Sequence, residues 1–416
     1  MSKKVVVIGA GMVGIVAASF LQRDGHTVAV VDPNGPGEGA SFGNAGGLNP
    51  SSVVPMSMPG IVRNVPKWLS DPLGPLAIRW TYLPSLLPWL IRFIRAGTPE
   101  RVESQARALR DLLGPCLDCL EPLVKAADAQ DLVHRRGALF VSRSKDAFTN
   151  DRAAWDLRRR HGVKWDDLNA DEIRQLEPTL SHDYVRGIFV RENGHTSNPH
   201  RLVSRLAEAF QRGGGTIIRS RVLDFEFDGA QLRAVRTTDG SIAAEIAVVA
   251  AGVHSKPLAA ALGDRIPLET ERGYHIVLRN PEIMPRIPLA DVDAKLVATP
   301  METGLRFAGI VELAGLTAPP NWRRADILLE RGRRMLPSLA GSHAEESLSR
   351  WMGHRPSTPD SLPVIGPARR SPDVFYAFGH GHVGMAAAPT TGKIIGELVG
   401  GKVPSIPIEP FRAGRF

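Results

Sequence analysis

The chain begins with a pattern of apolar and polar positions that predicts a strand, a helix and a second strand. Residues 3–32 read KKVVVIGAGMVGIVAASFLQRDGHTVAVVD, in which an apolar run, a group of glycines and a helical pattern are followed by another apolar run. Apolar runs of this length are typical of strands buried in a parallel sheet. The N-terminus is therefore expected to form one βαβ unit.

Later segments carry further signals for helices and strands. Asn198 and Pro199 are a typical helix start, with Asn as the N-cap and Pro in the first turn. Asp239 and Gly240 predict a hairpin turn between two strands. We expect a helix over 100–125, interrupted near Pro115, strands over 222–227, 232–238, 242–250, 266–278, 296–313 and 374–378, and a last helix over 384–400.

Composition and charge narrow the class of protein. The 416 residues are 43% apolar, which is ordinary for a globular protein and excludes a disordered or collagen-like chain. At about 150 residues per domain, this length predicts two or three folding units. The net charge of +8 favours acidic partners such as anionic lipid or small carboxylates. Nucleic acid is not expected as a partner, because few aromatic side chains lie among the scattered basic residues.

The glycines after the first strand form a G-x-G-x-x-G pattern, made by Gly9, Gly11 and Gly14. Between a strand and a helix, this pattern is typical of dinucleotide binding, since it lets the backbone approach a pyrophosphate at the positive end of the helix dipole. Asp32 ends the second strand, 21 residues after Gly11, where a carboxylate reaches a ribose hydroxyl and disfavours a 2′-phosphate. These four residues and their neighbours Met12, Val13 and Pro33 are candidates for binding a cofactor, either NAD or FAD.

Other glycine-rich segments favour FAD. The stretch 35–47 is too long for a simple turn and is expected to lie against a ligand. IAVVAAG at 246–252 is a strand that ends in small residues, and GHGHVGM at 379–385 is a second strand-to-helix turn whose N–H groups could face a flavin ring. An ordinary strand exit is the alternative for each segment. The candidates outside the first motif are Ser41, Val222, Ala251, Gly252, Gly379, His380, Gly381, His382, Gly384 and Met385.

Over nearly its whole length the chain resembles the FAD-dependent D-amino-acid oxidase superfamily, and within it the bacterial D-amino-acid dehydrogenases. The resemblance rests on VVVIGAGMVG at the start, SFGNAGGLNP at 41–50, GHRPSTPDSLPVIGP at 353–367 and GHGHVGM. It implies that a loop lies beside the isoalloxazine ring and that Arg355, in the RP-x-TPD motif, anchors the substrate carboxylate. The loop residues are Asn44, Ala45, Gly46 and Gly47.

Three departures from the family pattern concern the pocket and the flavin linkage. Gly47 stands where the dehydrogenases usually have Gln, and His382 and Met385 stand where they tend to have Thr and Trp. These differences leave the identity of the substrate open. Relatives that bind flavin covalently use a late cysteine, whereas this chain has none after Cys119, so FAD is expected to be held noncovalently.

Two side chains are candidates for contact with the substrate. Arg355 can grip a carboxylate through two parallel hydrogen bonds, and the alternative is a surface Arg paired with Asp360. Tyr274, in ERGYHI, could orient an amine or a carboxylate from its strand, and the alternative is a core tyrosine. Because side chains alternate along a strand, His275 would point to the face opposite Tyr274.

We expect an α/β protein in which a Rossmann-type FAD-binding domain is joined to a second, mostly antiparallel-sheet substrate domain. The FAD-binding domain is predicted from residues 1–60, 195–265 and 350–416, and the substrate domain from 61–194 and 266–349. The resemblance implies FAD-dependent oxidative deamination of a D-amino acid, with hydride passing from the α carbon to flavin N5 and then to a quinone or other electron acceptor. Oxidation of a secondary amine (proline, hydroxyproline, sarcosine or glycine type), a non-catalytic flavin-binding subunit and an NAD-only dehydrogenase are the alternatives.

Two further segments bear on location and on metals. The Trp-, Leu- and Arg-rich stretch 61–96, which includes Trp68, suits either a peripheral contact with a membrane or an inner packing face. Because Met1 to Lys4 leads directly into the first strand, we expect no signal peptide and a cytoplasmic location, with the inner face of the cell membrane as a place of contact.

The lone C-x-x-C of Cys116 and Cys119 and the pair His380 and His382 are not expected to bind metal.

Overall fold

The computed structural model describes residues 2–61, 74, 76–144, 146–339, 341 and 347–416. Its N-terminus confirms the predicted βαβ unit: β1 (Lys4–Ile8), α1 (Met12–Arg23) and β2 (Thr27–Asp32). The two strands pair in parallel, with Ile8 opposite Val31. Four of the five residues of β1 are buried, as an apolar run covered on both faces requires.

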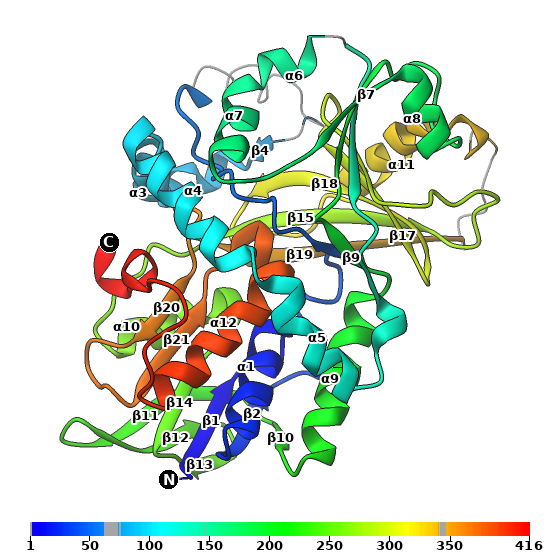
Figure 1. The fold of residues 1–416 in the computed structure, drawn as a ribbon. Helices are drawn as coiled ribbons and strands as arrows, with labels where there is room; N and C mark the ends of the chain where they lie inside the picture. Colours follow the sequence, from blue (N-terminus) through cyan, green and yellow to red (C-terminus); the bar gives the residue numbers. More distant parts are fainter. Residues whose placement is uncertain (1, 62–73, 75, 145, 340, 342–346) are drawn as a thin grey trace.

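A six-stranded sheet is built around this unit, in the lower half of Figure 1. It has the order β10-β2-β1-β14-β21-β20, and only the pairing of the last two strands is antiparallel. The carboxyl ends of its parallel strands therefore lie along one edge. The strands added to β1 and β2 are β10 (Thr216–Arg219), β14 (Ile246–Val249), β21 (Val374–Phe378) and β20 (Val364–Pro367).

Helices cover one face of this sheet, and a small sheet covers the other. Helix α12 (Gly384–Val399) crosses α1 so closely that a Cβ on Gly392 would lie 2.7 Å from a methyl carbon of Val16. Helices α5 (Cys116–Ala126) and α9 (Pro199–Arg212) join the same apolar core. On the opposite face lie α10 (Ser255–Ala261) and the antiparallel strands β11 (Val222–Asp228), β12 (Gln231–Thr237) and β13 (Gly240–Ala243).

The helix and hairpin signals of the sequence are confirmed. The Asn198 side chain accepts a hydrogen bond from the Arg201 N–H at the start of α9. Strands β12 and β13 form the hairpin predicted around Asp239. The strand predicted over 242–250 is wrong as one element, because the chain leaves β13 and enters β14 of the other sheet. At this crossing the Glu245 carboxylate accepts a hydrogen bond from the Lys4 N–H at 2.8 Å.

The second large sheet has nine strands and lies above the first in Figure 1. It is mostly antiparallel, since only the pairs β16–β6 and β4–β18 are parallel. The strand predicted over 296–313 is two strands, which turn just before Gly304. Along the sheet, the strands are β19 (Leu348–Ser357), β15 (Glu269–Leu278), β18 (Gly304–Leu313), β17 (Leu296–Met301), β16 (Leu289–Asp291), β6 (Ala138–Ser142), β8 (Arg186–Val190) and β7 (Asp166–Asn169), with β4 (Leu76–Ile78) beside β18.

The remaining elements surround these sheets. The helix predicted over 100–125 consists of α4 and α5, with the break at Pro115. Strand β19 lies in the range predicted for the FAD-binding domain, yet it pairs with β15 of the nine-stranded sheet, and the domain boundaries stay predictions. The other elements are β3 (Gly47–Leu48), β5 (Val133–His134), β9 (Gly194–Thr196), α3 (Leu83–Ala96), α4 (Pro99–Leu113), α6 (Ala147–Asn150), α7 (Arg152–Arg160), α8 (Ala170–Leu176) and α11 (Arg323–Met335).

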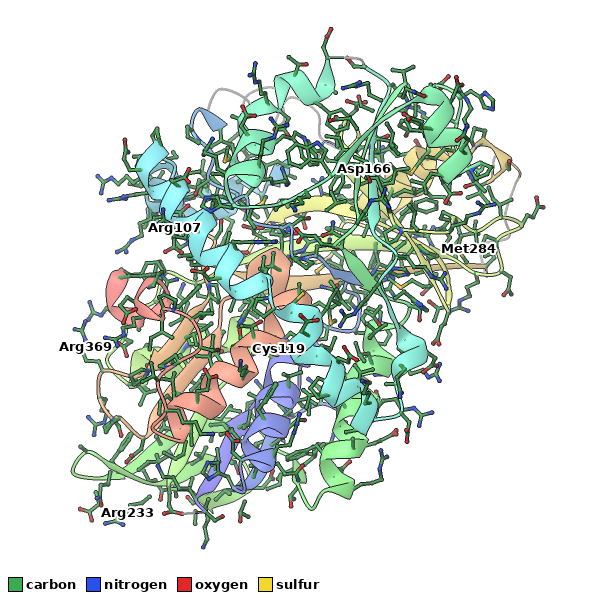
Figure 2. All side chains as sticks on the ribbon, viewed as in Figure 1. Arg107, Cys119, Asp166, Arg233, Met284 and Arg369 are labelled. Atoms are coloured by element: carbon green, nitrogen blue, oxygen red, sulfur yellow. The ribbon has the colours of Figure 1, made fainter. Side chains whose placement is uncertain are left out.

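The two cysteines belong to the packing of α5 against α12 (Cys119 is labelled in Figure 2). Both are free thiols, and burial raises the pKa of Cys116 to about 12, so it is not a reactive thiolate. In the described part of the chain, no cluster of three or more His, Cys, Asp or Glu side chains is arranged to hold a metal ion. A search of the same residues finds no helix with the length and apolarity needed to span a bilayer.

Candidate active site

A cavity of about 1490 Å³ lies between the two large sheets. Its wall includes residues that follow the carboxyl ends of β1, β2, β14 and β21, together with residues of β15, β18 and β19. Ligands of open parallel sheets bind at this edge. Since ordinary small-molecule sites measure about 300–1,000 Å³, the cavity has room for a large cofactor and a substrate.

The glycine motif after β1 shapes one end of this cavity. Gly9 has a φ of 112°, and a Cβ there would lie 2.5 Å from the Ala250 carbonyl oxygen. A Cβ on Gly14 would lie 1.9 Å from the Gly9 carbonyl oxygen, so this glycine lets α1 pack against the turn. The Asp32 carboxylate accepts hydrogen bonds from the Ala10 and Asn34 N–H groups, both at 2.8 Å, and retains lone pairs for a ligand.

The loop 43–47 forms a second part of the wall and is fixed to the nine-stranded sheet. Gly46 has a φ of 81°, and its N–H donates to the Asn44 side chain at 2.8 Å. Such anchoring holds the loop backbone in one position. Three side chains donate to its carbonyl oxygens: His275 Nδ1 to Gly43 at 3.0 Å, Thr299 Oγ1 to Ala45 at 2.9 Å, and an Arg306 N–H to Asn44.

The turn 379–385 forms a third part, where β21 leads through a short 3₁₀ segment into α12. Gly379 and Gly381 have φ values of 83° and 49°, which favour glycine. The ring of His380 is buried, its Nε2 lies 3.0 Å from Thr391 Oγ1, and burial lowers its pKa to about 3. His380 is therefore a neutral packing residue, whereas His382 is partly exposed.

Arg355 extends from β19 over the middle of the cavity wall. It lies over Gly273, where a Cβ would stand 2.2 Å from the guanidinium carbon. One of its N–H groups donates to the Ile310 carbonyl oxygen at 3.3 Å. Ile310 has a φ of 60° beside a register shift in β18, a strained conformation for a β-branched residue. The Asp360 alternative is excluded as the partner of Arg355, because Arg415 binds that carboxylate at 2.7 Å.

Glu271 lies directly opposite Arg355 in the pairing of β15 with β19, and both line the cavity. Its carboxylate accepts a short hydrogen bond from His382 Nε2. Burial alone would raise the pKa of Glu271, but the charges of His382 and Arg355 and the His382 hydrogen bond outweigh it and lower the pKa. An ionised carboxylate therefore lies next to the partly buried guanidinium.

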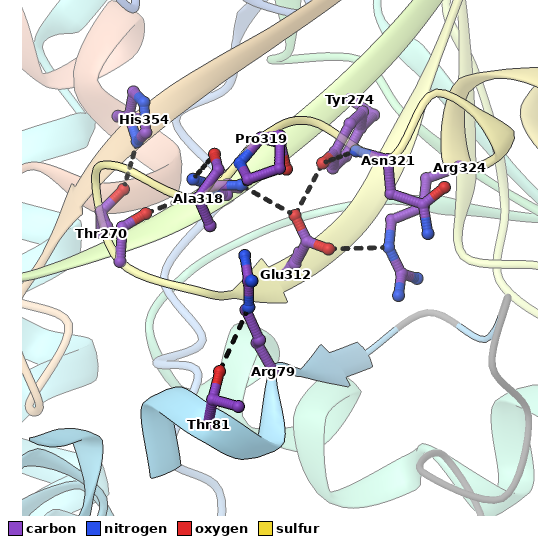
Figure 3. A network of polar contacts seen from close by, with 12 residues as sticks. Arg79, Thr81, Thr270, Tyr274, Glu312, Ala318, Pro319, Asn321, Arg324 and His354 are labelled. Atoms are coloured by element: carbon purple, nitrogen blue, oxygen red, sulfur yellow. Dashed lines mark hydrogen bonds and ion pairs between the residues drawn. The ribbon is translucent and has the colours of Figure 1, made fainter. Parts of the chain in front are cut away.

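Tyr274 lines the cavity, and its hydroxyl has hydrogen-bond partners inside the protein. Arg272 and Tyr274 lie on the face of β15 that packs in the core, whereas Glu271, Gly273 and His275 face Arg355 and Trp351. The Tyr274 hydroxyl donates to Glu312 at 2.6 Å and accepts from the Asn321 N–H at 3.0 Å, as Figure 3 shows. Its hydroxyl therefore has two partners inside the protein, and a contact of Tyr274 with the substrate stays a prediction.

The cavity brings together most residues that the sequence singled out. Gly14 and Gly46 are outside its wall and act through backbone packing and a turn. Glu271 and Trp351 were not among the predicted residues. Because side chains alternate along a strand, the sequence ERGYHI does place Glu271 on the same face as His275. The predicted residues in the wall are Gly9, Gly11, Met12, Val13, Asp32, Pro33, Ser41, Asn44, Ala45, Gly47, Val222, Ala251, Gly252, Tyr274, Arg355, Gly379, His380, Gly381, His382, Gly384 and Met385.

These walls fit an FAD. The N-termini of α1 and α12 both begin in the cavity wall, where their N–H groups suit phosphate and electron-rich ring atoms. Asp32 would hold the ribose, the turn after β1 the pyrophosphate, and the loop 43–47 with the turn 379–385 the ring. A Cβ on Gly9 would collide with the Ala250 carbonyl oxygen, so the turn after β1 can take this position at the cavity edge only with a glycine.

Comparison with known proteins identifies the class. The chain matches the model of the FAD-dependent oxidoreductase family over residues 4–398 and belongs to this family, so its cofactor is FAD. It is 46% identical over 417 residues to a D-amino-acid oxidase of Bradyrhizobium diazoefficiens, covering 100% of this chain and 99% of the relative. It is 32% identical to a D-amino acid dehydrogenase of Paramagnetospirillum magneticum, over 99% of both chains.

Solved structures support the fold. Glycine oxidase from Bacillus cereus superposes with a TM-score of 0.74 at 19% identity, covering 97% of this chain and 96% of that one. L-proline dehydrogenase from P. horikoshii gives a TM-score of 0.75 at 18% identity, covering 100% and 98%. At this identity the likeness establishes the arrangement of a Rossmann-type FAD-binding part and a second sheet, as the sequence predicted.

Proposed function

We propose that this protein catalyses the oxidative deamination of a D-amino acid to a 2-oxo acid and ammonia. The observation that carries the proposal is the partly buried guanidinium of Arg355 in the wall of the FAD cavity, held between Ile310 and Glu271. A guanidinium in this setting suits a carboxylate, which it binds in one orientation. The full-length similarity to D-amino-acid oxidase supports the choice of substrate.

The residues of the chain serve this reaction mainly by positioning. When bound, FAD would supply the acceptor for the hydride that leaves the α carbon. Arg355 binds the carboxylate and so places the α carbon, while Trp351 lines the cavity and stacks on His275, with ring centroids 5.2 Å apart. The C–H bond breaks, a C=N bond forms, and water then hydrolyses the imino acid. Positioning of this kind can supply about 7–11 kcal/mol of a barrier.

The test is reduction of the flavin by D-amino acids without oxygen. Arg355→Met is expected to retain FAD, as measured by visible absorption, and to raise KM for D-amino acids by about 100-fold or more, since a charged hydrogen-bonded pair is lost. Arg233→Met, an exposed arginine of β12 labelled in Figure 2, is the matched control and should have the kinetics of the unmodified protein. Unchanged KM in Arg355→Met would contradict the proposal.

The acceptor that reoxidises the flavin is a further part of the proposal. One end of the cavity is lined by apolar side chains of α3, including Trp89, Leu90 and Phe93, which suits a quinone. Oxygen is the second candidate, because the 46% identical relative is named an oxidase. Reduced protein should react faster with a short-chain quinone than with dissolved oxygen in stopped flow. Faster peroxide formation in air would assign the oxidase reaction instead.

The outer face of α3 supports the peripheral membrane contact expected for 61–96, of which residues 62–73 and 75, including Trp68, lie outside the described residues. Leu87, Ile91 and Ile94 of α3, and Trp80 of the 3₁₀ turn that precedes it, are between 41% and 66% exposed. Arg92 and Arg95 are exposed on the same helix, whose sequence has no acidic residue. An apolar stripe with arginines suits an anionic lipid surface.

Sedimentation with vesicles tests this contact. The protein should bind phosphatidylglycerol vesicles and not phosphatidylcholine vesicles, and Ile91→Glu should weaken binding. Val403→Glu, which changes an exposed valine elsewhere on the surface, is the control. Binding that is equal for both lipids, or that Ile91→Glu leaves unchanged, would contradict the contact.

A further inference from the structure

The pair formed by Glu271 and His382 lies in the cavity wall beside Arg355, and His382 has no part in the positioning described so far. The Glu271 side chain is 7% exposed, and the His382 side chain is 30% exposed. Since Glu271 accepts from Nε2, that nitrogen carries a proton, and in the neutral form of the imidazole Nδ1 then holds the lone pair. Within the described ranges, His382 Nδ1 has no hydrogen-bond partner.

The charges around this pair match an amino acid. Arg355 and Glu271 place a cation and an anion side by side in the wall, opposite each other across β15 and β19. A free amino acid carries a carboxylate and an ammonium on one carbon. When Arg355 binds the carboxylate, the ammonium one carbon away is brought to the side of Glu271 and His382.

The reaction requires a proton acceptor at this place. The new C=N bond is formed with the lone pair of the amine nitrogen, and an ammonium has no lone pair to give. One N–H bond must therefore break before the hydride can leave the α carbon. At neutral pH amino acids are mainly in the ammonium form, so the protein gains rate by accepting this proton.

We propose that His382 Nδ1 accepts the proton of the substrate ammonium, and that Glu271 is a positioning residue that fixes the imidazole and stabilises its charged form. The inference rests on the proposed function. In the step, the ammonium N–H bond breaks, its electron pair stays on nitrogen, and the proton forms an N–H bond at Nδ1. The resulting imidazolium faces the Glu271 carboxylate, so the pair carries no net charge.

Other histidines around the cavity lack these properties. His275 and His380 are buried, with pKa values lowered by burial to about 3, and each has a partner other than a carboxylate. His354 bonds with Thr270 Oγ1 at 2.8 Å, and burial lowers its pKa to about 4. His254 is exposed at the rim and has no carboxylate partner among the described residues.

Few other charged groups face His382. The 3₁₀ segment that carries it packs against β19 and α12. From β19, Arg355 is on the same side, whereas Arg350 pairs with Asp326 at 2.6 Å and His354 lies on the opposite face. From α12, Lys393 and Glu397 lie nine or more positions beyond the start of the helix and pair with each other at 3.8 Å. The electrostatics of the imidazole is therefore set mainly by Glu271 and Arg355.

The test is the rate of flavin reduction by a D-amino acid, measured by anaerobic stopped flow across pH. At pH 7, His382→Gln is expected to reduce the rate by about 100-fold, the lower end of the contribution of a general base. The deficit should shrink as the pH rises and vanish above the pKa of the substrate amino group, because the free amine then needs no acceptor. Glu271→Gln should show a smaller deficit with the same convergence.

Two controls separate this role from a structural one. His161→Gln removes a histidine that lies 2.9 Å from Glu103 outside the cavity, and it should react like the unmodified protein. The 2-oxo acid, which has the carboxylate and no amine, should perturb the flavin spectrum of His382→Gln with unchanged affinity. A deficit that is the same at every pH, or no deficit in either variant, would overturn the proposal.

Failure of this inference is distinguishable from failure of the proposed function. If no D-amino acid reduces the unmodified FAD-bound protein, the function is wrong. If the unmodified protein is reduced and the variants fail to converge at high pH, only the role of His382 is wrong.

Discussion

Gly273→Ala tests the geometry of the carboxylate anchor most closely. The added Cβ would stand 2.2 Å from the guanidinium carbon of Arg355 and 2.2 and 2.4 Å from its two terminal nitrogens. Because carbon atoms in contact lie about 3.5–4.0 Å apart, the guanidinium has to move by more than about 1 Å. The fold should tolerate this, since the atoms that move are the end of a long side chain.

A displacement of about 1 Å at the anchor is expected to cost about 100-fold in kcat/KM, or about 2.7 kcal/mol. Most of the loss should appear in KM for D-amino acids, because the guanidinium loses its alignment with the carboxylate. FAD content, measured by visible absorption, should be unchanged. Gly414→Ala is the control, since its added Cβ would meet nothing within 4 Å. Unchanged kinetics in Gly273→Ala would refute the placement of Arg355 in the site.

Two predictions concern stability. Glu312→Gln should lower the free energy of unfolding in urea by about 3–5 kcal/mol, because it leaves the buried guanidinium groups of Arg272 and Arg324 without a carboxylate; a loss below about 1 kcal/mol would contradict this account of the network. Burial lowers the pKa of His195 from 6.5 to about 4, so the unfolded state binds its proton first and stability is lost as the pH falls from about 6.5. The melting temperature should therefore fall between pH 6.5 and pH 4, and less steeply in His195→Gln, whereas an identical pH profile in that variant would rule out the contribution of this histidine.

Much of the fold was predicted from local signals in the sequence. The βαβ unit, the start of α9 and the last strand and helix were predicted because each depends on neighbours in the sequence. The segment 242–250 was expected as one strand, since an apolar run does not reveal where the chain passes from one sheet to another. The hairpin of β17 and β18 was missed because the segment 296–313 was expected to be one continuous strand.

The candidate site divides in a similar way. The glycine turns were found because a positive φ or a close contact between backbone segments requires a glycine, as at Gly9, and a glycine can be recognised in the sequence. The hydrogen bonds of the Tyr274 hydroxyl with Glu312 and Asn321 were not predicted, because these partners come from other parts of the sequence. Glu271 and His382 are 111 residues apart, and only the pairing of β15 with β19 beside the turn 379–385 brings them together.

Anaerobic addition of individual D-amino acids to the purified FAD-bound protein tests the central claim most directly. The flavin absorption near 450 nm is expected to bleach with at least one D-amino acid, with one equivalent each of 2-oxo acid and ammonia formed per flavin reduced. If dithionite bleaches the flavin while every D-amino acid leaves it oxidised, the assignment of Arg355 and its cavity to amino-acid oxidation is contradicted.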